Sequence, residues 1–308
     1  MSATPRIALT TASFLPATAL SASSIRRVLR FASAEGFAGV EILMTRAACA
    51  AVQRGESWAD APVVSAHEVW NPRDTLRGEI RRIATRTPQS RGMVPYPMDC
   101  VFFRDSDVSE AALFAAADKQ NAVAVVSQLA SPVTGQRYAS PCAAVQVHPD
   151  LGPGGAHMPL EAVMHAVEAG DYDVVLDTYH VRRRVRMYVA GKTEINPPAA
   201  ASGDASLGGI QRVWSALGKR VRLVHFQPGL PAELAVMLKE KRFPPALKEF
   251  ADLLPELARR GIPIVVEASP VVVSAVCESP LRAAATGKGF WGSAMRDTVL
   301  RIRDVLVR

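Results

Sequence analysis

The chain has 308 residues, 49% hydrophobic and 21% charged, so it can bury the core of one α/β barrel of about 250 residues, although two average domains would fit the length as well. The net charge of +7 comes from Lys and Arg spread along the chain, which favours a basic solvated surface over a nucleic-acid face. Four cysteines without a C-x-x-C pair indicate neither a zinc knuckle nor a disulfide framework and fit a cytoplasmic location, and no apolar run approaches the roughly 20 residues of a membrane span.

Short apolar runs alternate with helical patterns from one end of the chain to the other. The predicted strands are residues 6–11, 39–43, 62–67, 122–128, 144–148, 173–177, 221–225 and 263–267. The predicted helices are residues 21–35 (or 24–35, with Ser21 or Ser24 as the N-cap and Gly36 as the stop), 75–84, 109–120, 159–170, 209–218, 244–260 and 293–307.

The order of these elements predicts an α/β fold, a closed (β/α)8 TIM barrel that forms a single domain over residues 1–308. The strand runs are continuously apolar instead of alternating, which is typical of parallel strands buried on both faces. Residues 71–103 are basic and rich in Pro and Gly, and we interpret them as a loop insertion.

Several predicted strands end in side chains that can bind a metal or transfer a proton. His67 ends the third strand, Asp177 the sixth and His225 the seventh, and Glu267 the eighth. In a parallel barrel these ends converge on one face, where such barrels keep their active sites. Each residue also has a structural interpretation: Asp177 can cap the next helix, and His225 can be a hydrogen-bonded core histidine.

Four short phrases, in this order along the chain, resemble the xylose-isomerase-like TIM barrel superfamily. They are G-x-x-G-V-E at residues 36–41, L-D-T-x-H at 176–180, V-H at 224–225 and G-x-P-x-x-V-E at 261–267. That superfamily includes sugar-phosphate isomerases and epimerases, some dehydratases and the endonuclease IV type of DNA-repair nuclease. The resemblance implies the barrel fold and interprets Glu41 as a structural residue of the family.

The resemblance also implies a site for one divalent ion, held by Glu, Asp, His and Glu from the fifth to the eighth strands. Asp177, His225 and Glu267 match three of these ligands. The fifth-strand Glu is absent, and His148, or Gln146 with a shifted register, stands in its place. Two imidazoles with two carboxylates suit Mn, Fe, Co or Zn better than Mg.

In the epimerases of the superfamily, two glutamates on opposite faces of the substrate move a proton alpha to a carbonyl. Only Glu267 remains here, so we expect one-base enolisation, dehydration or hydrolysis, with Glu267 or His67 as the catalytic base.

Substrate-binding residues are expected close to these strand ends. His180 and Trp70 are candidates for the pocket wall, and Arg182, Arg183 and Arg184 can grip a phosphate or carboxylate with their guanidinium groups. A solvated basic helix start is the alternative interpretation of the three arginines.

The sequence therefore predicts a metal-dependent isomerase or epimerase that acts through an enediolate on a small carbohydrate-like or anionic carbonyl substrate. A homo-oligomer is compatible with this reading, and neither a nucleic-acid partner nor a membrane is expected. The alternatives are an endonuclease IV-type phosphodiesterase, which the positive charge favours, and a catalytically inactive barrel that only binds a ligand.

Overall fold

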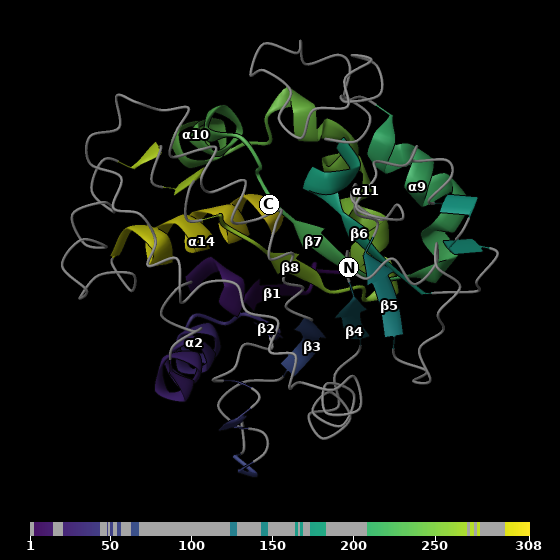
Figure 1. Ribbon diagram of the computed structural model, residues 1–308. Coiled ribbons are helices and arrows are strands. Elements are labelled where there is room, and N and C mark those ends of the chain that lie inside the picture. Colours follow the sequence, from purple (N-terminus) through teal and green to yellow (C-terminus); the bar gives the residue numbers. More distant parts are fainter. Residues whose placement is uncertain are drawn as a thin grey trace, which may run out of the picture.

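The computed structural model is built on a closed barrel of eight parallel strands (Figure 1). It describes residues 3–14, 21–43, 48, 50–51, 54–56, 63–67, 124–127, 143–146, 164–165, 167–168, 173–182, 208–269, 272–273, 276–277 and 293–308, with the backbone alone for 63–67, 124–127, 143–146 and 293. The strands are β1 (Ile7–Thr10), β2 (Gly39–Leu43), β3 (Val63–His67), β4 (Ala124–Ser127), β5 (Ala143–Gln146), β6 (Asp173–Asp177), β7 (Val221–Phe226) and β8 (Ile264–Val266).

All eight predicted strands are present, and each pairs in parallel with the next along the chain. β8 closes the barrel by pairing with β1, where Ile264 lies opposite Ile7. The helices predicted between the strands are tested only in part, because most of residues 147–172, including most of the predicted helix 159–170, and the whole connection after β3 lie outside the described residues. The proposed insertion at residues 71–103 and the predicted helices 75–84 and 109–120 lie in the same stretch.

The described helices cover the outside of the barrel. They are α2 (Ala22–Ala34), α9 (Gly209–Leu217), α10 (Pro231–Glu240), α11 (Lys248–Arg260) and α14 (Ser293–Leu306). α2 packs on β2, α9 on β6, and α14 on β1 and β8 (Figure 1). None of the helices in the described part of the chain has the length and apolar character needed to span a bilayer.

Two helices, α2 and α10, test the sequence rules directly. The predicted cap of α2 is confirmed, since the Oγ of Ser21 accepts a hydrogen bond from the Ser24 N–H at 3.2 Å. α10 was not predicted. Its buried face contains Glu233 beside Leu234 and Met237, so the apolar period that marks a helix is interrupted by a charge.

The apolar side chains form two layers, one on each face of the barrel wall. Outward residues such as Leu176, Val224 and Val266 join the large core under the helices. A second, smaller cluster consists of Ala8, Val175, Leu223 and Val265. Because side chains alternate along a strand, this second cluster fills the barrel interior. The next inward positions, two residues further along β6, β7 and the end of β8, are Asp177, His225 and Glu267.

Candidate functional site

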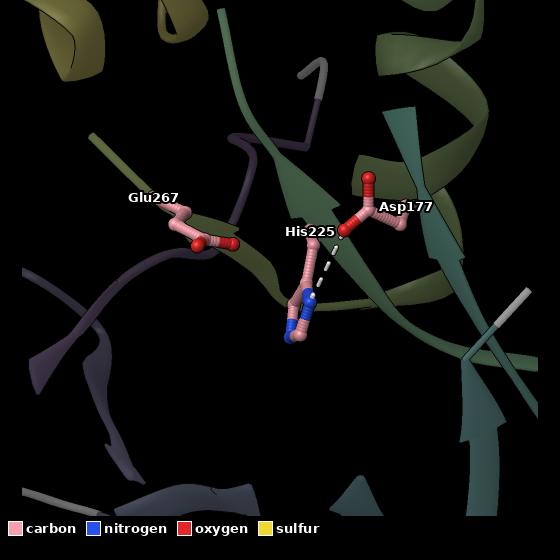
Figure 2. Close-up of side chains that lie close together, drawn as sticks. All are labelled: Asp177, His225 and Glu267. Carbon is pink, nitrogen blue, oxygen red and sulfur yellow. Dashed lines mark ion pairs between the residues drawn. The ribbon is translucent and has the colours of Figure 1, made fainter. Parts of the chain in front are cut away.

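Asp177, His225 and Glu267 lie together at the carboxyl ends of three neighbouring strands. Each offers one ligand atom, and these atoms all lie within 4.8 Å of one another. Figure 2 shows Asp177 and Glu267 on either side of the His225 ring. The Nδ1 atom of His225 is 3.7 Å from Oδ2 of Asp177, longer than a usual hydrogen bond.

These three residues fit a divalent ion. Two atoms that share one ion through bonds of about 2.2 Å can stand at most about 4.4 Å apart, close to the spacing found here. Asp177 and His225 are almost fully buried, and ionised groups withdrawn from water need a compensating charge. Two carboxylates and one imidazole form a donor set suited to Mn, Fe, Co or Zn. The predicted fourth ligand, His148, lies outside the described residues, as does the side chain of Gln146.

Asp177 has the capping role considered from the sequence. Its Oδ1 accepts hydrogen bonds from the backbone N–H groups of Tyr179 at 2.9 Å and His180 at 2.8 Å, so it caps the helical residues 178–182. Its Oδ2 faces His225. The cap therefore fixes the carboxylate so that its second oxygen is directed at the ring.

Glu41, which the sequence indicated only as a structural residue, is part of this cluster. Its Oε2 lies 2.8 Å from Nε2 of His225, and both side chains are buried. Glu41 stands on β2, where its backbone lies opposite Thr10 of β1. A single acidic residue within the apolar run Gly39–Leu43 was the signal in the sequence, but nothing in it named the partner.

The cluster shifts the pKa values of its members in different directions. Burial would raise the pKa of Asp177, but the neighbouring His180 and His225 hold it well below its usual range. Burial would lower the pKa of His225, but the carboxylates of Glu41 and Asp177 raise it well above its usual value. Burial raises the pKa of Glu267 to about 7, with Asp177 and Glu41 adding to this and His225 opposing it.

The raised pKa of Glu267 predicts a pH-dependent stability in the metal-free protein. The folded state binds this proton more tightly than the unfolded chain does, so the contribution is complete below about pH 4.5 and is lost as the pH rises to about 7. The loss is at most about 1.4 kcal/mol per pH unit. Urea unfolding of the chelator-treated protein and of Glu267→Gln across this range measures it. The free energy of unfolding of the parent protein should fall relative to that of Glu267→Gln as the pH rises; a constant difference would contradict the assignment.

The prediction that Arg182 binds a substrate anion is corrected, because protein groups already bind its guanidinium. Its guanidinium forms a buried ion pair with both carboxylate oxygens of Glu233, at 2.6 and 3.1 Å. Its Nε donates to the Thr178 carbonyl oxygen at 2.8 Å, and its Nη atoms lie 3.4 Å from the carbonyl oxygens of Gln227 and Ala246. Arg182 therefore ties the segment after β6 to the segment after β7 and to α10.

The other predicted substrate-binding residues are placed only in part. His180 is half-buried in the short helical segment after β6, with its ring 5.3 Å from that of Tyr179. His67 ends β3, opposite Leu43, but its side chain is not among those described. Trp70, Arg183 and Arg184 lie outside the described residues.

Close packing joins the segments that carry Asp177 and His225. The Thr178 hydroxyl accepts a hydrogen bond from the Gln227 N–H at 3.1 Å. The Gly229 backbone lies against the Tyr179 ring, where a Cβ would stand 1.8 Å from Cδ2 of that ring. Only glycine permits this approach. The ends of β6 and β7 are therefore held in a fixed relation.

The end of β8 is held in a similar way by the segment after β1. The Ser13 hydroxyl accepts a hydrogen bond from the Ala268 N–H at 2.9 Å, next to Glu267. The Thr11 hydroxyl accepts one from the Leu43 N–H at 2.8 Å, at the end of β2. The short segment η1 (Thr11–Phe14) therefore holds both the backbone next to Glu267 and the end of the strand that carries Glu41.

No family model and no curated protein matches this chain. Among solved structures the chain is similar to D-allulose 3-epimerase from Methylomonas sp., determined in complex with D-allulose. The sequence identity is 13%, the TM-score is 0.40, and the alignment covers 98% of this chain and 96% of that chain. Similarity at this level does not indicate an activity.

Proposed function

We propose that this protein is a metal-dependent isomerase or epimerase-like enzyme of the xylose-isomerase-like barrel type. Its substrate is a small polyhydroxylated or anionic carbonyl compound, such as a sugar or sugar phosphate. The observation that carries the proposal is the convergence of Asp177, His225 and Glu267 at the carboxyl end of the barrel, where parallel barrels perform their chemistry.

Asp177, His225 and Glu267 would hold the ion, and His148 is proposed as the fourth ligand. When bound, a divalent ion in such a site polarises a carbonyl oxygen. The cap that fixes Asp177 and the contacts that tie β6 to β7 preset the positions of these side chains, so little rearrangement is needed to receive the ion.

Glu267 is the proposed catalytic base. In the ion-free protein burial raises the pKa of Glu267 to about 7, and a bound cation would lower it, which favours the carboxylate form that accepts a proton. It would take the proton alpha to the substrate carbonyl, which leaves an enediolate, and return that proton to the adjacent carbon. His67, at the end of β3, is the second candidate for this proton transfer.

The substrate would lie beside the short helical segment after β6. His180 stands next to the Asp177 cap and can bind a substrate hydroxyl or phosphate oxygen. Trp70, Arg183 and Arg184 remain proposed substrate contacts, whereas Arg182 does not, because Glu233 and backbone carbonyls bind its guanidinium group.

The test is exchange of an alpha proton with solvent deuterium, followed by NMR over a panel of ketoses, aldoses, sugar phosphates and 2-keto acids. We expect the metal-loaded protein to exchange the proton of at least one compound and Glu267→Gln to abolish the exchange. The control Glu256→Gln changes an exposed carboxylate on α11 and should leave the rate unchanged.

Two results would contradict the proposal. Metal-dependent cleavage of abasic DNA without exchange on any carbonyl compound would indicate a nuclease. Saturable binding of a sugar without exchange would indicate a barrel that binds a ligand only.

A further inference from the structure

Glu41 reaches His225 across the inside of the barrel. β2 and β7 are not neighbours in the sheet, because β8 and β1 lie between them. The two residues are 184 positions apart in the chain, yet Oε2 of Glu41 lies 2.8 Å from Nε2 of His225. Their side chains are only 3% and 2% exposed.

This contact holds a proton on the Nε2 atom of His225. An ionised carboxylate can only accept hydrogen bonds, so the Nε2 atom of His225 must be the donor. A ring that binds an ion must be the neutral imidazole, which has one N–H and one nitrogen with a lone pair. With the proton on Nε2, the lone pair is on Nδ1, the atom that faces Asp177 at 3.7 Å.

A purely stabilising role does not account well for a carboxylate at this position. Burial of an ionised pair is weak evidence for stability, since apolar residues of similar volume often serve a core as well or better. Glu41 also adds negative charge close to Asp177 and Glu267, which raises the pKa of Glu267 and favours a cation at this position, either a protonated His225 or a bound ion.

We propose that Glu41 is a positioning residue that holds His225 in the Nε2–H tautomer, with Nδ1 directed at the ion. The inference rests on the proposed function, because it requires that Asp177, His225 and Glu267 bind a metal. Carboxylates that bind the second nitrogen of a ligating histidine orient its ring and raise its basicity, and their loss typically lowers metal affinity about 10–100-fold.

Two variants of Glu41 separate the hydrogen bond from the charge. Glu41→Gln removes the negative charge but keeps an oxygen that can accept from Nε2, whereas Glu41→Leu removes both. We expect Zn²⁺ affinity, measured by competition with a chromophoric chelator, to fall about 10–100-fold in Glu41→Leu and less in Glu41→Gln. Asp173→Asn, a partly exposed carboxylate at the start of β6, is the control and should bind as the parent protein does.

The tautomer itself provides a second measurement on the unaltered protein. In ¹⁵N-labelled, Zn²⁺-loaded protein, the His225 Nε2 should carry a slowly exchanging proton, and Nδ1 should show the shift of a metal-bound nitrogen. Because this NMR measurement uses the unaltered protein, it tests the proposed role of Glu41 even if a Glu41 variant fails to fold.

Three results would overturn the inference. The first is unchanged affinity in both Glu41 variants, and the second is a proton on Nδ1 with the ion on Nε2; both would leave the proposed metal site intact. The third is failure of the parent protein to bind Zn²⁺, Mn²⁺ or Co²⁺, which would reject the proposed function and this inference together.

Discussion

Replacement of Glu233 by Gln is expected to lower the free energy of unfolding by about 3–5 kcal/mol, because it leaves the buried guanidinium of Arg182 without a counter-charge. The pair is only 3% and 6% exposed, so water cannot take the place of the lost carboxylate. One N–H of the new amide would also oppose the N–H groups of Arg182. Denaturant unfolding measures the loss.

A matched surface variant and a double variant identify the cause. Glu256→Gln breaks an exposed pair with Arg259 on α11 and should leave the unfolding midpoint unchanged. The double variant Arg182→Met/Glu233→Leu removes both charges and should recover part of the loss. Equal effects of Glu233→Gln and Glu256→Gln would contradict a structural role for the buried pair.

Asp177→Asn should weaken metal binding by more than about 100-fold, beyond the 10–100-fold typical for loss of a residue that only orients a ligand. The folded state should remain, because Asn keeps the oxygen that accepts from Tyr179 and His180, and Asn caps helices as well as Asp. The variant therefore separates the cap from the charge that faces His225.

Metal-induced stabilisation measures this effect. An ion present at 100 times its Kd raises the free energy of unfolding by about 2.7 kcal/mol, which shifts the thermal midpoint upward. We expect that shift in the parent protein and in Asp173→Asn, which changes a carboxylate at the other end of the same strand. An equal shift in Asp177→Asn would remove Asp177 from the ligand set.

The sequence was sufficient to predict the strands and the strand-end residues of the site. Each strand is an apolar run. In β6, β7 and β8 an apolar side chain that points into the barrel is followed, two residues later, by a polar one. The pairs are Val175 and Asp177, Leu223 and His225, and Val265 and Glu267. The alternation of side chains and the common direction of the strands are local properties. They are enough to bring these three polar residues to one end of a closed barrel.

The partners of buried charges could not be predicted in the same way. The contact between Glu41 and His225 depends on how far two non-adjacent strands lie apart inside the barrel, which no local pattern encodes. The pairing of Arg182 with Glu233 depends on the packing of α10, a helix that the apolar period did not reveal. The expectation that Arg182 grips an anion was wrong for this reason, since a basic residue after a strand end can equally turn inward to an acid on a neighbouring helix.

Anomalous diffraction from crystals of the protein loaded with Mn²⁺, Co²⁺ or Zn²⁺ tests the metal site most directly. We expect one strong peak between Asp177, His225 and Glu267, with ligand bonds of about 2.0–2.2 Å. The bond to His225 should be made by Nδ1, and the map would show whether His148 completes the set. The absence of a peak at this cluster, or full occupancy at another site only, would contradict the account.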